Sequence, residues 1–257
     1  MITVFRFSNR RGYSVPPLNV VYEESDTEQV WQINCGGTRG YFVRSGDTIE
    51  DDMNAQAADS HFMAQRITAA LLISGFGLFE ADATGRLIFT GISGPFDWSS
   101  HIDRPDPLEK DVEYANVADV TDWLVALCTH TVLRRAIYDA CQALLNPHEA
   151  LVFVYRGLEW LKVGQRLKWD DVASDLGVTT AEIKDLTKFA NVETGVRHAS
   201  RSGRKMRASL DNYGTWVCGL IDGINAARVR IEPAFSPMTA KQVAAAVARA
   251  APIVPFP

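Results

Sequence analysis

The stretch that decides the fold of the second half of the chain is KWDDVASDLGVTTAEIKDLTKFAN, residues 168–191. Counted from Trp169, a small residue, Ala173, stands fifth, and Gly177 stands ninth, where a sharp turn favours a left-handed backbone. The fourth, eighth, tenth, fifteenth and eighteenth positions are apolar: Val172, Leu176, Val178, Ile183 and Leu186. The pattern predicts two short helices that each bury one face, joined by a turn at Gly177.

The second of these helices carries its own start signal. Thr179 is a favourable N-cap residue, and Glu182 three positions later completes a capping box. Such a cap stabilises a helix by roughly 1 kcal/mol. Seven matching positions and the cap resemble the helix-turn-helix superfamily, over residues 169–190 only.

The resemblance implies a role for the exposed face of the second helix. In that superfamily, residues early in this helix face the major groove of DNA. Carried over by position, this face comprises Thr179, Thr180, Ala181, Lys184, Asp185 and Lys188, and the nucleic-acid contacts would come from Thr179, Thr180, Lys184 and Lys188. Four acidic residues count against a contact with phosphates: Asp170, Asp171, Asp175 and Glu182. The same unit also occurs as a purely structural element, so both alternatives stay open.

A basic segment, NVETGVRHASRSGRKMR (residues 191–207), follows directly. Ser and Gly between the cations predict a flexible loop, and such loops contact phosphates. The candidate contacts are Arg197, Arg201, Arg204, Lys205 and Arg207. The alternatives are a solvated loop or one that pairs with acidic residues elsewhere in the chain.

Charge is unequally distributed along the 257 residues. Residues 1–150 contain 11 Lys/Arg and 21 Asp/Glu, whereas residues 151–257 contain 15 and 10. The asymmetry indicates different surfaces for different partners, nucleic acid for the basic part and a protein for the acidic part. Chance and ordinary solvation explain it equally well.

The remaining pattern predicts strands first and helices later. Four short runs rich in β-branched and aromatic residues occupy residues 2–45, a helix is expected over 54–74, and residues 77–91 read as a hairpin that turns at 82–85. Further helices are expected over 117–145, 148–164 and 206–229, with Asn146, Pro147 and Glu149 starting the second of them. Small residues at Gly219, Gly223 and Ala227 predict a close helix contact.

These elements predict an α+β fold. A strand-rich domain with one helix covers residues 1–95, and a Pro/Asp-rich connection covers 96–116. A helical domain with the helix-turn-helix-like unit covers 117–250, and an extended Pro-rich tail covers 251–257.

No motif in the chain points to catalysis, a metal or a cofactor. The four cysteines form no paired-ligand spacing, and the nucleotide-binding and hydrolase motifs are absent. Unpaired thiols, no signal-like segment and no long apolar run favour a cytoplasmic protein without a membrane contact. A helical ribonuclease needs Arg and His on one helix face; Arg197 and His198 are adjacent, which leaves only a loop-borne site with Asn191.

The sequence therefore favours a non-enzymatic nucleic-acid-associated protein, with DNA preferred over RNA. The alternative is an interaction or scaffold subunit, with its tryptophans as interface anchors if they prove exposed. A helical ribonuclease-like protein comes third. The sequence leaves an enzyme and a homo-oligomer open.

Overall fold

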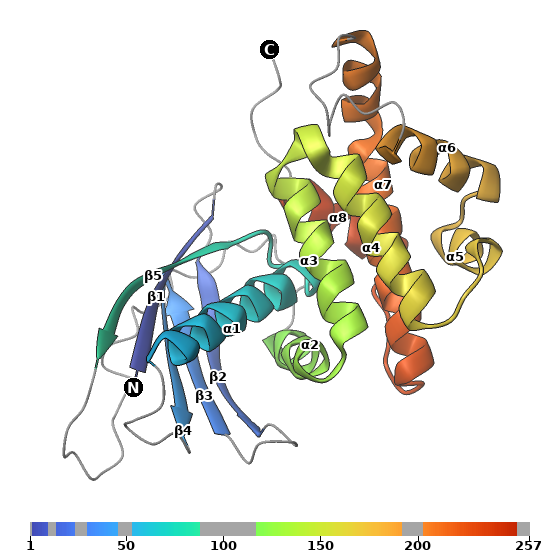
Figure 1. Cartoon of the computed structure of the whole chain (residues 1–257). Helices are drawn as coiled ribbons and strands as arrows, with labels where there is room; N and C mark the ends of the chain where they lie inside the picture. Colours follow the sequence, from blue (N-terminus) through green and yellow to red (C-terminus); the bar gives the residue numbers. More distant parts are fainter. Residues whose placement is uncertain are drawn as a thin grey trace. The chain divides into compact units, whose positions relative to one another are not determined.

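The computed structural model describes residues 2–9, 14–23, 30–45, 53–87, 117–191 and 203–250. The chain divides into two compact units, Met1–Val125 and Ala126–Pro257. The first contains an antiparallel sheet and a long helix, and the second is helical, so the α+β prediction is confirmed (Figure 1). The division after Val125 falls downstream of the predicted connection 96–116, which lies outside the described residues, as does the tail 251–257.

The first unit is built on five strands in the order β2-β3-β4-β1-β5, and every neighbouring pair is antiparallel. Their bounds are β1 (Ile2–Ser8), β2 (Val15–Glu23), β3 (Val30–Gly37), β4 (Arg39–Ser45) and β5 (Glu80–Leu87). Pro16 and Pro17 lie in the edge strand β2, where the register shifts, because a proline cannot donate to a central ladder.

One face of this sheet is apolar and lies against α1 (Met53–Ile73). Phe42 stacks on Phe5, with ring centroids 4.9 Å apart, and contacts Phe7 at 6.4 Å. The Thr3 hydroxyl donates to the Ser60 hydroxyl of α1 at 2.9 Å, which joins the helix to β1. Side chains alternate along a strand, so the opposite face carries the polar residues.

The hairpin predicted for residues 77–91 is wrong. Residues 80–87 form one continuous strand, β5, which pairs with β1. Val4 is opposite Gly85 and Phe5 is opposite Ala83, so Thr84 is an extra residue that forms a bulge. The bulge accommodates the local turn propensity of Asp82–Gly85 while the long-range ladder continues.

The second unit packs helices around α7 (Gly203–Ile231). Its other elements are α3 (Thr131–Leu145), η1 (Pro147–Glu149), α4 (Ala150–Gly164), α5 (Trp169–Leu176), α6 (Thr180–Asn191) and α8 (Ala240–Ala250). Helices α3, α4 and α7 contact one another in pairs, and α8 packs on α7. A Cβ on Gly157 would approach the Leu220 side chain to 2.7 Å, so glycine permits the close contact of α4 with α7.

The predicted helix 117–145 is two helices. Helix α2 (Val117–Thr129) ends before His130, whose extended backbone (φ −113°, ψ 98°) precedes α3. The β-branched residues Thr129 and Thr131 flank this break, and such residues have lower helix propensity. The division between the two units falls within α2.

One predicted helix start needs correction, and one helix had not been predicted. Asn146 makes no side-chain cap; its amide donates to the Gln142 carbonyl at 3.3 Å, and Pro147–Glu149 is a 3-10 turn before α4. Helix α8 had not been predicted as a separate element. Its signal was Thr239 followed by Gln242: the Thr239 N–H donates to the Gln242 side chain at 2.8 Å, as in a capping box. Within the described parts of both units, no helix is long and apolar enough to cross a membrane.

Candidate nucleic-acid interface

Helices α5 and α6 form the pair that the sequence predicted. Gly177 ends α5 with φ 65° and ψ 26°, and the Val178 N–H donates to the Ala173 carbonyl at 3.0 Å. The first helix buries Val172, Ala173 and Leu176, and the second buries Ile183 and Leu186. The predicted turn and apolar faces are therefore confirmed, whereas Val178 is only half-buried.

The start of α6 is fixed by the predicted cap. The Thr179 N–H and hydroxyl both donate to Glu182 Oε2, at 2.7 and 2.8 Å, and the Glu182 N–H donates to the Thr179 hydroxyl at 3.2 Å. These hydrogen bonds from Thr179, the backbone one foremost, hold the pKa of the Glu182 carboxyl below its ordinary value. The capping-box prediction is confirmed.

Helix α5 packs on α7 and is fixed there by an apolar and an ionic contact. The Leu176 side chain lies against Gly219 and Gly223: a Cβ on these glycines would lie 3.5 and 3.2 Å from it. Asp175, the neighbour of Leu176, forms an ion pair with Arg230, which also donates to Gln165 at 3.0 Å. The predicted role of the two glycines in helix packing is thus confirmed: Gly219 faces α5, and Gly223 faces both α5 and Leu161 of α4.

The four acidic residues that count against a phosphate contact all have internal partners. Asp170 accepts from the Thr180 hydroxyl at 2.5 Å, and Asp171 accepts from the Lys168 N–H at 2.8 Å. Asp175 pairs with Arg230, and Glu182 caps α6. Three of these carboxylates also lie in the first turn of a helix, where the macrodipole favours negative charge. Each acid therefore has a structural reason to be present.

The predicted contact residues of α6 divide into two kinds. The hydroxyls of Thr179 and Thr180 already donate to Glu182 and Asp170, so neither is an uncommitted donor. Lys184 and Lys188 are exposed on α6 together with Asp185, and Lys188 has a further interaction within the chain. The lysines, more than the threonines, give this face its capacity to meet phosphates or base edges.

The described part of the basic segment is helical, whereas a loop was predicted. Helix α7 begins at Gly203, before the predicted start at Met206. Arg204, Lys205 and Arg207 therefore lie in its first turns. Arg197 and Arg201 lie outside the described residues, as does His198 of the ribonuclease alternative.

The tryptophans do not supply the exposed anchors that a scaffold role would use. Trp31 and Trp123 are buried, and Trp98 lies outside the described residues. Trp160, Trp169 and Trp216 are half-buried on the helical unit. Trp160 is covered by Arg135, 4.2 Å from its ring centroid, while Trp169 stacks on Tyr155 at 6.0 Å and lies under Lys162 at 5.0 Å.

An ion pair between a buried carboxylate of α3 and an exposed arginine of α4 was not predicted from the sequence. Asp139 is 1% exposed, and the Arg156 Nε donates to its Oδ1 at 2.8 Å, while its Oδ2 has no hydrogen-bond partner. Burial raises the pKa of the Asp139 carboxyl, against the opposing effect of Arg156. Burial, with the charge of Asp139, raises the pKa of Cys141 to about 12, so this thiol is not a nucleophile at neutral pH. An acid inside the apolar run AIYDACQALL was the available signal.

Comparisons with family models, with curated proteins and with solved structures found no match to this chain. Within the described ranges, no three His, Cys, Asp or Glu side chains are grouped in a way that could hold a metal ion. The case for a function therefore depends on the geometry of α5 and α6 and on the charge of the second unit.

Proposed function

We propose that this protein binds nucleic acid, preferentially duplex DNA, through the helix-turn-helix-like unit α5–α6, and that it does so without catalysis. The observation that carries the proposal is the presentation of α6. This helix is capped by Thr179 and Glu182, joined to an anchored α5 through Gly177, and exposes Lys184 and Lys188.

Rigidity is the first requirement of a recognition helix. A recognition helix must be held in a fixed orientation, because base edges in the major groove are read by side chains within a few ångströms. The contacts of Leu176 and Asp175 hold α5, and α6 in turn packs on α4 and α5. A helix that is held in a fixed orientation and exposes lysine side chains suits a duplex.

Charge supports the same proposal. The acidic residues of α5 and the α6 cap are engaged within the unit, and the exposed face of α6 carries Lys184 and Lys188 together with Asp185. Arg197, Arg201, Arg204, Lys205 and Arg207 follow α6 in sequence and would add the phosphate contacts that dominate affinity. We assign the phosphate contacts to this segment and to Lys188, and the base-edge contact to Lys184.

Titration of the full chain with labelled duplex DNA, single-stranded DNA and RNA tests the proposal. Fluorescence anisotropy at low and physiological salt should show tightest binding to the duplex, with affinity falling as salt rises. Lys184→Gln should weaken binding and change the preference among duplex sequences, whereas Lys241→Gln, an exposed lysine of α8, should leave both unchanged. If no nucleic acid binds at low salt, the proposal fails and a scaffold subunit becomes the better account.

A further inference from the structure

The turn between α4 and α5 holds an arginine in a backbone conformation that favours glycine. Arg166 has φ 56°, and no other non-glycine residue in the described part of the chain has a positive φ. The Arg166 N–H donates to the Val163 carbonyl at 3.2 Å, and the Leu167 N–H donates to the Lys162 carbonyl at 2.9 Å, as in a Schellman motif. Glycine is the usual residue at this position because it has no Cβ. The termination of α4 therefore does not explain the choice of an arginine.

The macrodipole of α4 is already complemented without Arg166. Lys162 lies in the last turn of α4, where a cation is favourable, and its Nζ lies 5.0 Å from the centroid of the Trp169 ring. Arg166 and Lys168 are both exposed, and no ion pair engages either side chain within the described ranges. Two exposed cations thus follow one another on a turn that backbone hydrogen bonds fix to α4.

This turn leads directly to the start of α6. The Thr180 hydroxyl donates to Asp170 Oδ1 at 2.5 Å, which brings the first turn of α5 against the first turn of α6. Lys168 stands two residues before Asp170. Asp170 and Asp171 adjoin the two cations, but Asp170 accepts from Thr180 and Asp171 accepts from the Lys168 N–H at 2.8 Å. Both carboxylates are therefore used in holding the helix starts, and neither forms an ion pair with Arg166.

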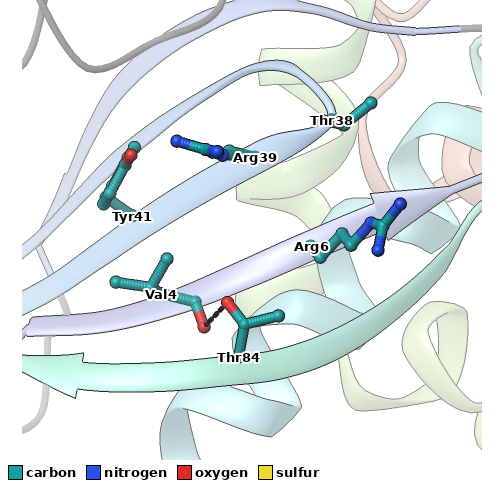
Figure 2. Close-up of a pocket in the computed structure, with 6 residues that line it drawn as sticks. All are labelled: Val4, Arg6, Thr38, Arg39, Tyr41 and Thr84. Atoms are coloured by element: carbon teal, nitrogen blue, oxygen red, sulfur yellow. Dashed lines mark hydrogen bonds between the residues drawn. The ribbon is translucent and has the colours of Figure 1, made fainter.

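The cations on the sheet of the first unit are arranged differently. A pocket of about 360 Å³ lies there beside Arg6 and Arg39 (Figure 2). Figure 2 shows the two guanidinium groups pointing to opposite ends of the pocket. Arg39 has other interactions within the chain, and Arg6 is paired in the register with the exposed Asp82 of β5. These two arginines therefore do not converge on one anion.

We propose that Arg166 and Lys168 contact phosphates of duplex DNA at the edge of the groove that α6 enters. The inference rests on the proposed function and extends its contact surface to the α4–α5 turn. A guanidinium can donate two parallel hydrogen bonds to a phosphate, and Arg166 starts from a backbone that is held in place on α4. The stability that the left-handed backbone costs is then offset by a side chain fixed for this contact. Contacts to phosphate carry no sequence information, so the effect is the same for every duplex.

The test uses the full chain, labelled duplex DNA and three variants. Arg166→Gly removes the charge and suits the left-handed backbone, Arg166→Lys keeps the charge, and Lys168→Gln removes the neighbouring charge. In fluorescence anisotropy, Arg166→Gly and Lys168→Gln should each flatten the slope of log affinity against log salt concentration by about 0.9, alike for all duplex sequences. Arg166→Lys should keep the parent's slope. Circular dichroism should show that Arg166→Gly melts no earlier than the parent, so that weaker binding is not a result of unfolding.

The control is Lys241→Gln on α8, which should keep both the slope and the affinity of the parent. Suppose that the parent binds the duplex and Lys184→Gln changes its sequence preference. If either Arg166→Gly or Lys168→Gln then keeps the parent's slope, the inference is overturned while the proposed function stands. It is overturned as well if Arg166→Lys flattens the slope as much as Arg166→Gly does. If no duplex binds at low salt, the proposed function fails and this inference fails with it.

Discussion

Helices α5 and α6 are both short and amphipathic and are joined at Gly177, yet the protein holds them in different ways. Helix α5 is fixed on α7 by Leu176 between two glycines and by the pair Asp175–Arg230. Helix α6 buries Ile183 and Leu186 but leaves Lys184, Asp185 and Lys188 exposed. The comparison indicates that α5 anchors the unit, whereas α6 keeps one face exposed.

The largest effect should come from removing the apolar anchor of α5. Leu176→Ala should lower the free energy of unfolding by about 2–5 kcal/mol, because the cavity beside Gly219 and Gly223 cannot close fully. Chemical denaturation monitored by tryptophan fluorescence measures it. A loss below about 1 kcal/mol would show that α5 is not anchored in this way.

A smaller effect should separate two glycines of the same helix. A Cβ on Gly223 would meet Leu161 at 3.1 Å and Leu176 at 3.2 Å, whereas a Cβ on Gly214 meets nothing within 4 Å. Gly214→Ala should stabilise the protein by about 0.5–1 kcal/mol through helix propensity. Gly223→Ala should forfeit that gain, and equal thermal stabilities of the two variants would remove the argument for a tight α5–α7 contact.

The smallest effect should be the acid sensitivity of the α6 cap. Because the folded-state pKa of Glu182 is lowered, its carboxylate stabilises the fold above its ordinary pKa, and this contribution is lost as pH falls through the folded-state value. Glu182→Gln keeps an acceptor without the charge. The parent should be more stable than this variant at neutral pH, and this difference should disappear in strong acid. Thermal unfolding across the acid range measures it. A difference that does not change with pH would contradict the electrostatic role of the cap.

Local signals predicted these two helices well. The spacing of Val172, Leu176, Ile183 and Leu186 and the Thr179–Glu182 cap are interactions within a few residues, so sequence alone contains them. The packing role of Gly219 and Gly223 was also predicted, but their partner Leu176 was not. A stripe of small residues indicates close packing against another helix but does not identify that helix.

Elements that depend on distant partners were predicted poorly. Residues 80–87 contain turn formers, yet they form the strand β5, which pairs with β1 near the start of the chain. The only irregularity within this described strand pair is a bulge at Thr84. The pocket beside Arg6 and Arg39 was likewise invisible, because only the strand register brings these residues together. Arg204, Lys205 and Arg207 were placed in a loop because serine and glycine spacing outweighed the helical pattern that follows.

The central claim, that α6 faces nucleic acid, is tested most directly by the salt dependence of duplex binding. Log affinity should be plotted against log salt concentration for the parent, for Lys184→Gln with Lys188→Gln, and for the α8 control Lys241→Gln. Each phosphate neutralised on duplex DNA contributes about −0.9 to the slope; since Lys184 is assigned to a base edge, the double variant should flatten the slope by up to about 0.9, through the loss of Lys188. The control should keep the parent's slope, and a double variant with the parent's slope and affinity would contradict the assignment of α6.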